Sequence, residues 1–149
     1  MRRRSKGEFT LEVPASLAMG FFTPEGERSW VPGWDPVYAQ GEPSELPGTV
    51  FTTDVHDVST IWMIADLDRQ TSRATYVRVA PGHHAGTVEV QCTDQESGGC
   101  VVMVAYDMSL LPGSDSSGLD GYDEASFAAM MDEWADAVRA AMSGEEHRG

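Results

Sequence analysis

Residues 25–36 read EGERSWVPGWDP and hold two of the four tryptophans of the chain. The two prolines of this segment fix their own φ angles, remove two backbone donors and push the preceding residues away from helical geometry. Gly33 permits a sharp turn between Trp30 and Trp34. Two large aromatic side chains on a stiff, turned loop have to be covered by other residues. The segment therefore predicts either the edge of a core or the mouth of a pocket.

The size and composition around this loop are those of a single globular domain. The chain has 149 residues, of which 41% are hydrophobic, and its mean hydropathy is -0.30. A chain of this length buries about 70% of the surface that its unfolded form exposes. We therefore expect one domain over residues 7–143, a disordered basic tail over residues 1–6 and a frayed tail over residues 144–149.

The charge distribution argues against a nucleic-acid partner. The formal net charge is -14, from 24 acidic and 10 basic residues. Four of the basic residues lie in the first six positions, which leaves six for the rest of the chain. A nucleic-acid backbone is bound by lysines and arginines clustered on one face. We therefore expect a solubilising basic tail and no nucleic acid.

No segment predicts a membrane span or a secretory signal. No apolar run approaches the roughly 20 residues that a span requires, and no hydrophobic region follows the basic start. We expect a cytoplasmic protein, monomeric or homodimeric, with no metal and no cofactor. A disulfide between Cys92 and Cys100 is geometrically conceivable, but this compartment favours two free thiols.

The hydrophobic periodicity predicts an antiparallel sheet followed by a helix. Residues 8–13 alternate polar and apolar, as in a half-buried strand, and residues 15–22 form a short helical segment. Residues 39–47 are polar and rich in Gly and Pro, which is typical of an exposed connection. Regularly spaced turns indicate a meander. The further strands are expected at residues 49–53, 60–67, 74–80, 86–93 and 100–110.

A long amphipathic helix is predicted over residues 122–142. Apolar side chains recur there at steps of three and four residues and form one stripe. Asp120 or Asp123 can cap its start, and Ser143 with Gly144 supplies a stop. A sheet curved round this helix would bury the stripe. The residues of the stripe are Phe127, Met130, Met131, Trp134, Val138, Ala141 and Met142.

Four segments and the terminal helix resemble the START-like superfamily, also called SRPBCC, which includes polyketide cyclase/dehydratase-like proteins and the birch-pollen-allergen fold. The segments are WVPGWDP at residues 30–36, GTVFTT at 48–53, IWM at 61–63 and YVRV at 76–79. The resemblance covers about residues 7–142. It implies an α+β helix-grip fold, in which a curved antiparallel sheet of six to seven strands wraps round a long C-terminal helix, with two short helices after the first strand. Its functional content is broad, because the superfamily uses one container for lipid transfer, ligand binding, cyclase chemistry and partner binding.

An apolar cavity between sheet and helix would be lined mainly by aromatic residues and methionines. Alternation along residues 100–110 points Tyr106 inward, because Asp107 and Ser109 occupy the other face. The facing of Trp62 stays open, since both of its neighbours are apolar. The candidate ligand-binding residues are Trp30, Trp34, Trp62, Val104, Tyr106, Phe127, Met130, Met131 and Trp134.

Residues 74–80 allow two orientations. Val77 and Val79 would ordinarily form the core face and leave Tyr76 and Arg78 outside, and this is the orientation that we expect. In the alternative, Arg78 faces the cavity and holds a carboxylate or a polarised carbonyl. Tyr76, Arg78 and Tyr106 are the candidate catalytic residues, and no acid–base pair is evident.

The histidines carry no recognisable site. His56, His83 and His84 fall between predicted strands, where a histidine is usually solvated. Adjacent histidines seldom chelate one metal ion without further ligands nearby.

Three functions remain open on this pattern. We favour the binding of a hydrophobic small molecule (a lipid, a polyketide-like or an aromatic compound) in the cavity. A cyclase or dehydratase would use the same cavity, with Arg78, Tyr76 or Tyr106 polarising a carbonyl or moving a proton. A protein-interaction module would instead fill the cavity with its own side chains.

Overall fold

The computed structural model describes residues 1–55, 57–114, 119 and 121–148. Its elements follow the predicted order of one strand, short helical turns, a run of strands and a long helix. They are β1 (Arg2–Leu11), α1 (Ala15–Ala18), the 3-10 turns η1 (Met19–Phe22) and η2 (Gly26–Ser29), β2 (Val37–Tyr38), β3 (Val50–Val55), β4 (Val58–Asp68), β5 (Arg73–Ala80), β6 (His84–Asp94), β7 (Cys100–Leu110) and α2 (Glu124–Arg148).

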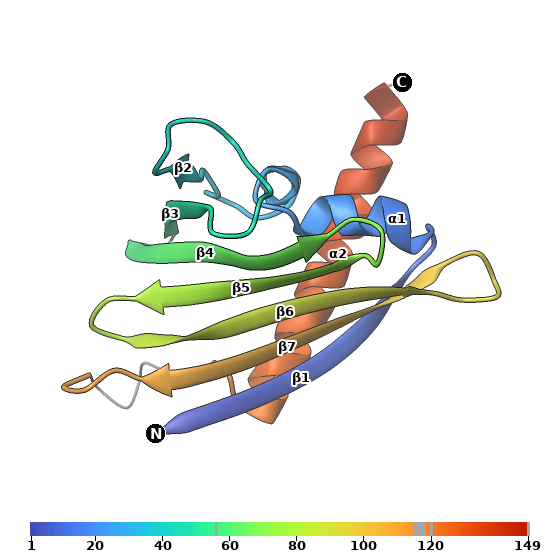
Figure 1. The fold of residues 1–149 in the computed structure, drawn as a ribbon. Helices are drawn as coiled ribbons and strands as arrows, with labels where there is room; N and C mark the ends of the chain where they lie inside the picture. Colours follow the sequence, from blue (N-terminus) through green and yellow to red (C-terminus); the bar gives the residue numbers. More distant parts are fainter. Residues whose placement is uncertain (56, 115–118, 120, 149) are drawn as a thin grey trace.

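The strands form one antiparallel sheet in the order β1-β7-β6-β5-β4-β3-β2. Strands β3 to β7 pair with their neighbours in sequence, and β1 closes the sheet beside β7. The helix α2 lies across one face of the sheet (Figure 1). This arrangement confirms the predicted helix-grip fold. The short strand β2, inside a segment that precedes the predicted connection, was not predicted.

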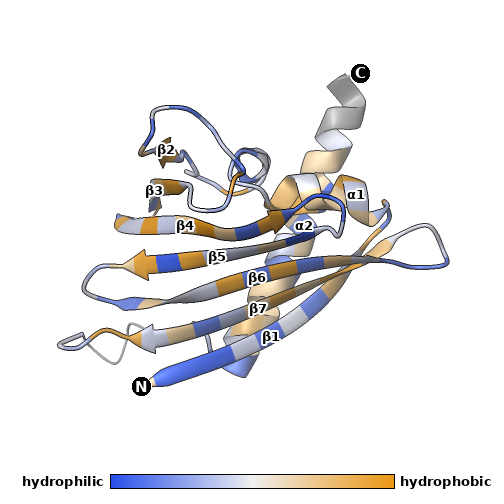
Figure 2. Cartoon of the chain, in the orientation of Figure 1, coloured by the Kyte–Doolittle hydropathy of each residue, from blue (hydrophilic) through white to orange (hydrophobic). Residues whose placement is uncertain are grey.

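Alternation along the strands decides which face of the sheet is buried. In β7 every second residue from Cys100 to Met108 is buried, and the residues between them are only half-buried. Hydrophobic and hydrophilic bands follow each other along the strands, while β1 begins with a hydrophilic stretch (Figure 2). The register of β4 on β5 shifts between Ile64 and Asp66. Such a bulge bends the strand and increases its twist, which helps the sheet to curve round α2.

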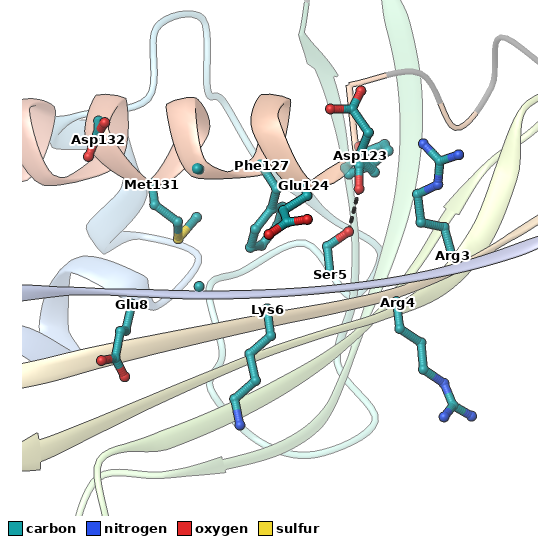
Figure 3. Close-up of a pocket in the computed structure, with 13 residues that line it drawn as sticks. Arg3, Arg4, Ser5, Lys6, Glu8, Asp123, Glu124, Phe127, Met131 and Asp132 are labelled. Atoms are coloured by element: carbon teal, nitrogen blue, oxygen red, sulfur yellow. Dashed lines mark hydrogen bonds between the residues drawn. The ribbon is translucent and has the colours of Figure 1, made fainter.

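Residues 2–6 are not the disordered tail that we expected. They belong to β1, which pairs with β7 along its whole length. The guanidinium of Arg2 donates two hydrogen bonds to Asp107, at 2.7 and 2.6 Å, and the hydroxyl of Ser5 donates to the carbonyl of Tyr122 just before α2 (Figure 3). The composition misled us because charged side chains on an edge strand stay in water while their backbone pairs.

The helix α2 begins as predicted and ends later. The Asp123 carboxylate accepts hydrogen bonds from the backbone N–H and the hydroxyl of Ser126, both at 2.9 Å, and so caps the helix. Asp120, the other predicted cap, lies outside the described residues. The helix continues through Gly144 to Arg148. The predicted stop at Gly144 is therefore wrong, because a glycine inside a helix costs only about 1 kcal/mol.

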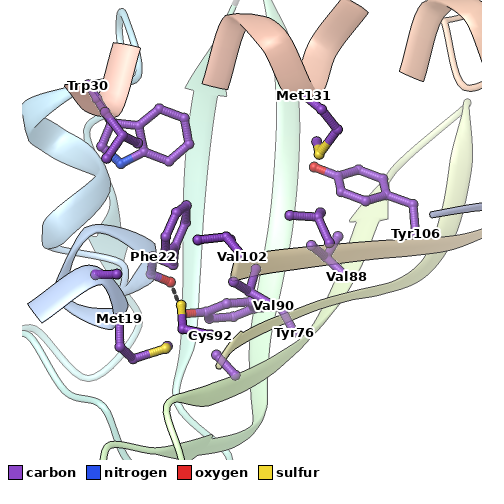
Figure 4. Close-up of a cluster of buried hydrophobic side chains, with 14 of the residues drawn as sticks. Met19, Phe22, Trp30, Tyr76, Val88, Val90, Cys92, Val102, Tyr106 and Met131 are labelled. Carbon is purple, nitrogen blue, oxygen red and sulfur yellow. Dashed lines mark hydrogen bonds between the residues drawn. The ribbon is translucent and has the colours of Figure 1, made fainter. Parts of the chain in front are cut away.

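Aromatic and aliphatic side chains fill the space between α2 and the sheet (Figure 4). Phe22 lies at the centre, with its ring 5.8 Å from Trp30 and 6.2 Å from Trp134. Cys92 and Cys100 are buried free thiols, as predicted. No described helix is both long and apolar enough to cross a bilayer.

One glycine of the sheet has to lack a side chain. A Cβ atom at Gly86 on β6 would lie 1.9 Å from the carbonyl oxygen of Asp107 on β7, whereas a Cβ atom at Gly144 would meet nothing within 4 Å. We expect Gly86→Ala to lower the free energy of unfolding by about 3 kcal/mol, because paired backbones have to separate. Gly144→Ala, the same chemical change, should raise it by up to about 1 kcal/mol. Urea unfolding of both variants measures the two values, and equal effects would contradict the strand packing described above.

Candidate functional site

Hydrogen bonds from its two indoles hold the loop of residues 25–36 against the body of the domain. The indole N–H of Trp30 donates to the carbonyl of Phe21 at 2.6 Å. The indole N–H of Trp34 donates to the carbonyl of Pro24 at 2.7 Å. Both acceptors come directly before the loop, so the two rings are turned inward.

The rings of this loop pack on α2 and on the sheet. Trp30 is 8% exposed, and its ring centroid lies 5.1 Å from that of Trp134 on α2. Trp34 is half-buried and packs edge to face on Trp62 of β4, at 5.6 Å. Both residues also border a cavity. The loop is therefore an edge of the core and a wall of a pocket at once.

The cavity has a volume of about 540 Å³ and lies between the loop, the sheet and α2. Its wall on α2 consists of four residues at helical spacing, namely Met130, Glu133, Trp134 and Ala137. Deeper in the core, between Phe22 and the sheet, a second space measures only about 20 Å³. The remaining lining residues are Glu27, Trp30, Val31, Pro32, Trp34, Thr53, Val55, Val58, Thr60, Trp62, Arg78, His83, His84, Tyr106 and Tyr122.

Tyr76 and Arg78 face inward, contrary to the orientation that we expected for β5. Tyr76 is 4% exposed, while Val77 and Val79 are only half-buried on the outer face of the sheet. The hydroxyl of Tyr76 donates to the carbonyl of Phe22 at 2.7 Å, and burial raises its pKa. Tyr76 therefore belongs to the core. The sequence pattern failed here because valines fit either face of a β-sheet.

Arg78 is the basic residue of the cavity wall. Its guanidinium carbon lies 5.1 Å from the ring centroid of Trp62, a cation–π distance. Trp62 is itself fixed by a hydrogen bond from its indole N–H to the hydroxyl of Thr53, at 3.0 Å. The Nε atom of Arg78 is buried and has no hydrogen-bond partner among the residues that the structure describes.

Glu27 is a functional candidate that the sequence analysis missed. It lies in η2, is half-buried and lines the cavity with Arg78. Burial raises the pKa of its carboxyl well above the usual range, and the positive charge of Arg78 opposes this rise. The clue in the sequence was its spacing, because Glu27 precedes Trp30 by one turn. In a helical turn, that spacing places two side chains on one side.

Tyr106 joins these two residues from β7. Its side chain is 5% exposed and inward-facing, as predicted. Burial raises the pKa of its hydroxyl, while the charge of Arg78 and a hydrogen bond with it act in the opposite direction. A carboxyl, a guanidinium and a phenol thus share one aromatic cavity. Such a set can bind an oxygen atom or transfer a proton.

His84 differs from its predicted place, whereas His83 lies in the turn and is exposed, as expected. His84 is the first residue of β6, is 5% exposed and packs edge to face on Tyr122, with ring centroids 5.7 Å apart. Both His83 and His84 line the cavity. Solvation is therefore the wrong description of His84. His56 lies outside the described residues. Within the described part of the chain, no three His, Cys, Asp or Glu residues are placed to hold a metal ion.

Six of the nine candidate ligand-binding residues border the cavity, namely Trp30, Trp34, Trp62, Tyr106, Met130 and Trp134. Val104 is fully buried in the core behind it. Phe127 and Met131 instead line a groove between β1 and α2 (Figure 3). Contact of any of these residues with a ligand stays a prediction.

The groove between β1 and α2 is a poorer candidate than the cavity. It measures about 780 Å³, but its wall alternates cations such as Arg3 and Lys6 with anions such as Asp123 and Asp132. The side chains of Arg4 and Lys6 point away from α2 (Figure 3). Ligand sites are usually apolar with a few convergent polar groups. The cavity fits this description and the groove does not.

Comparison with known proteins supports the fold. No protein-family model and no curated protein matches the chain. Among solved structures, Ara h 8.0201 is similar with a TM-score of 0.70 and 14% identity, over 96% of this chain and 99% of that one. The chain has the fold of the START-like superfamily.

Two further solved structures show a similar likeness in fold. Norcoclaurine synthase from Thalictrum flavum, in complex with dopamine and hydroxybenzaldehyde, gives a TM-score of 0.67 and 10% identity, over 100% of this chain and 90% of that one. CalU16 from Micromonospora echinospora gives a TM-score of 0.64 and 13% identity, over 99% of this chain and 90% of that one. Identities this low establish a common fold. The function has to be argued from the residues of the cavity.

The raised pKa of Glu27 predicts a pH-dependent stability. Below the pKa of about 4.3 that a glutamate has in an unfolded chain, Glu27 is protonated in both the folded and the unfolded state. Its ionisation then does not affect the free energy of unfolding. As the pH rises towards the higher folded pKa, the unfolded state loses this proton first, so stability falls. We expect Glu27→Gln to raise Tm at pH 8 and to leave it nearly unchanged at pH 4.

The matched control for this prediction is Glu12→Gln, which removes the same charge from an exposed position. It should shift Tm little at either pH, because surface charges contribute little to stability. If Glu27→Gln and Glu12→Gln gave the same pH profile, Glu27 would be solvated and would not face the cavity.

Proposed function

We propose that this protein binds a flat, largely apolar small molecule in the cavity between the loop, the sheet and α2. The observation that carries this proposal is the composition of the cavity wall. Trp30, Trp34, Trp62 and Trp134 all border the same space of about 540 Å³. A volume of this size suits an organic ligand of several fused or linked rings.

The state of the aromatic rings supports the proposal. The ring of Trp62 stacks on Phe51 with an interplanar angle of 5°, and Trp34 meets Trp62 at 67°. Two further contacts, between Trp134 and both Trp30 and Tyr106, hold the opposite wall. Because each ring is held by another ring, the wall is preorganised. Preorganised walls lose little conformational entropy when a ligand binds.

A cavity filled by its own side chains, the basis of the interaction-module hypothesis, is less well supported. Met130 and Trp134 line the cavity without closing it, and Met131 lies outside it. The space therefore stays open to a ligand from outside. A lipid of large volume would fit less well, because the space deeper in the core measures only about 20 Å³.

A side chain added to the cavity wall tests the binding proposal. Ala137 is half-buried and lines the cavity, whereas Ala140 is exposed on α2 and is not among the lining residues of the cavity. We expect Ala137→Phe to weaken the binding of an apolar naphthalene dye at least about tenfold, equivalent to about 1.4 kcal/mol. Ala140→Phe should leave the affinity unchanged. Tryptophan quenching during dye titration measures both.

Quenching also reports the position of the dye. A dye in the cavity lies against several indoles and should quench wild-type fluorescence strongly. Dye binding that survives Ala137→Phe with unchanged affinity and quenching would contradict the proposal, provided that circular dichroism shows the variant to be folded.

Catalysis by a cyclase or dehydratase of polyketide-like substrates is a second candidate function. The specific observation in its favour is Glu27, a carboxyl of raised pKa in the same cavity as Arg78 and Tyr106. In a β-hydroxyketone, Arg78 would stabilise the enolate oxygen. Glu27, as the carboxylate that the charge of Arg78 favours, would take the proton from the α-carbon. It would then deliver this proton to the departing hydroxyl, so that water and an enone form and the carboxylate is restored.

The enzyme candidate can be tested with a synthetic substrate. We expect wild-type protein to convert a naphthyl-substituted β-hydroxyketone into the conjugated enone, followed by absorbance. Glu27→Gln should slow this reaction about 100-fold, the usual contribution of a general acid or base, and Glu12→Gln should not. No acceleration by the wild-type protein would contradict the enzyme candidate, while dye binding would still support the binding proposal.

A further inference from the structure

Arg78 is an arginine in the cavity wall, and an apolar ligand does not explain its place there. It projects from the inner face of β5 towards the cavity, with its guanidinium over the ring of Trp62. It takes part in none of the ion pairs formed within the described residues. Its Nε–H is buried and lacks an acceptor within that same part of the chain. The cavity thus contains a cation with at least one buried N–H donor that no described residue uses.

An arginine in this situation is costly unless an anion accompanies it. Arg78 is half-buried, and burying part of a guanidinium without an anionic partner is unfavourable because the charge loses water. The cation–π contact with Trp62 offsets part of this cost. This contact uses the positive charge and leaves the N–H groups available to donate hydrogen bonds to a ligand.

The polar neighbours of Arg78 do not supply the missing negative charge. The charge of Arg78 acts on Glu27, but the two residues form no ion pair among those of the described chain. Burial favours the neutral form of the Glu27 carboxyl. Tyr106 is a phenol whose pKa burial raises, so it stays uncharged near neutral pH. Both groups can donate a hydrogen bond to an oxygen bound by Arg78.

We propose that the ligand carries an oxyanion, such as a carboxylate or an enolate, attached to a flat conjugated ring system, and that Arg78 binds this group. This inference rests on the proposed binding function and specifies the chemical class of the ligand. The planar N–H edge of arginine matches two oxygens of a carboxylate, and hydrogen bonds between charged groups are about twice as strong as neutral ones. The tryptophans of the wall bind the ring system.

Two probes that differ only in charge test this assignment. Naphthoate and naphthamide share one ring and nearly one shape, but only naphthoate is an anion at pH 7. Isothermal titration should show that wild-type protein binds naphthoate at least about tenfold more tightly than naphthamide, as expected for one charged hydrogen-bonded contact. Equal affinities would overturn the assignment of an oxyanion site.

Variants of two arginines on the same strand identify the binding group. Arg78→Met keeps the apolar stem and removes the charge, and it should reduce the preference for naphthoate to less than about twofold. Arg73→Met is the matched control, because Arg73 is on the outer face of β5, where it pairs with Glu89 at 3.2 Å. It should retain the full preference. Arg78→Lys keeps the charge without the planar edge and should give an intermediate ratio.

The outcomes separate this inference from the binding proposal. If the naphthalene dye binds but the protein shows no preference for naphthoate over naphthamide that depends on Arg78, the proposed oxyanion site is wrong. The proposal of an apolar binding cavity then still holds. If the dye, naphthoate and naphthamide all fail to bind, both proposals fail. Should Arg78→Met not fold, a reduced preference for naphthoate in Arg78→Lys supports the site, and an unchanged preference there contradicts the bidentate contact.

Discussion

The contact between the indoles of Trp30 and Trp134 is the constraint on which the cavity depends. It joins a loop between η2 and β2 to a helix near the other end of the chain, with ring centroids 5.1 Å apart. Both rings also reach Phe22, so the loop, α2 and η1 meet at one aromatic cluster. Without this junction, the loop would have no fixed distance from α2. The cavity would then have no defined wall on that side.

A second constraint follows from the polar residues that the sheet turns inward. Positions on the concave face of β5 and β7 are normally apolar, yet Arg78 and Tyr106 occupy two of them. Buried polar groups are tolerated when they satisfy one another or a ligand. Here Arg78 lowers the pKa values of both Glu27 and Tyr106 that burial raises. The charge of Arg78 therefore acts on both neighbouring groups and favours the ionised form of each.

Most of the fold could be predicted from the sequence, because it is encoded in local periodicity. The alternation along β7 and the stripe on α2 both indicate one buried side, and the cap at Asp123 has a local signature. Residues 2–6 could not be placed in β1 in this way. Four of these five side chains are charged, and the backbone hydrogen bonds that order the segment come from β7, which is distant in the sequence.

The candidate site was only partly predictable for a related reason. Large aromatic residues such as Trp30 and Trp34 have to be covered by other residues, so the sequence alone indicated that they could line the cavity. The polar residues depend on facing, and β5 carries side chains that suit either side of a sheet. Glu27 was missed because a charged residue in a loop is normally solvated. Glu27 is instead half-buried because η2 lies against the cavity, and the sequence does not show this position.

The pairing of β1 with β7 has a consequence for the order of events in folding. Arg2 lies opposite Ser109, so nearly the whole sheet has to be synthesised before β1 finds its partner. Contacts between residues so far apart form late and raise the contact order, which slows folding. Until then, β1 is an unpaired strand on a growing chain. The three arginines and the lysine of β1 keep the unpaired strand soluble. Their charge also disfavours pairing with another chain before β7 has been synthesised.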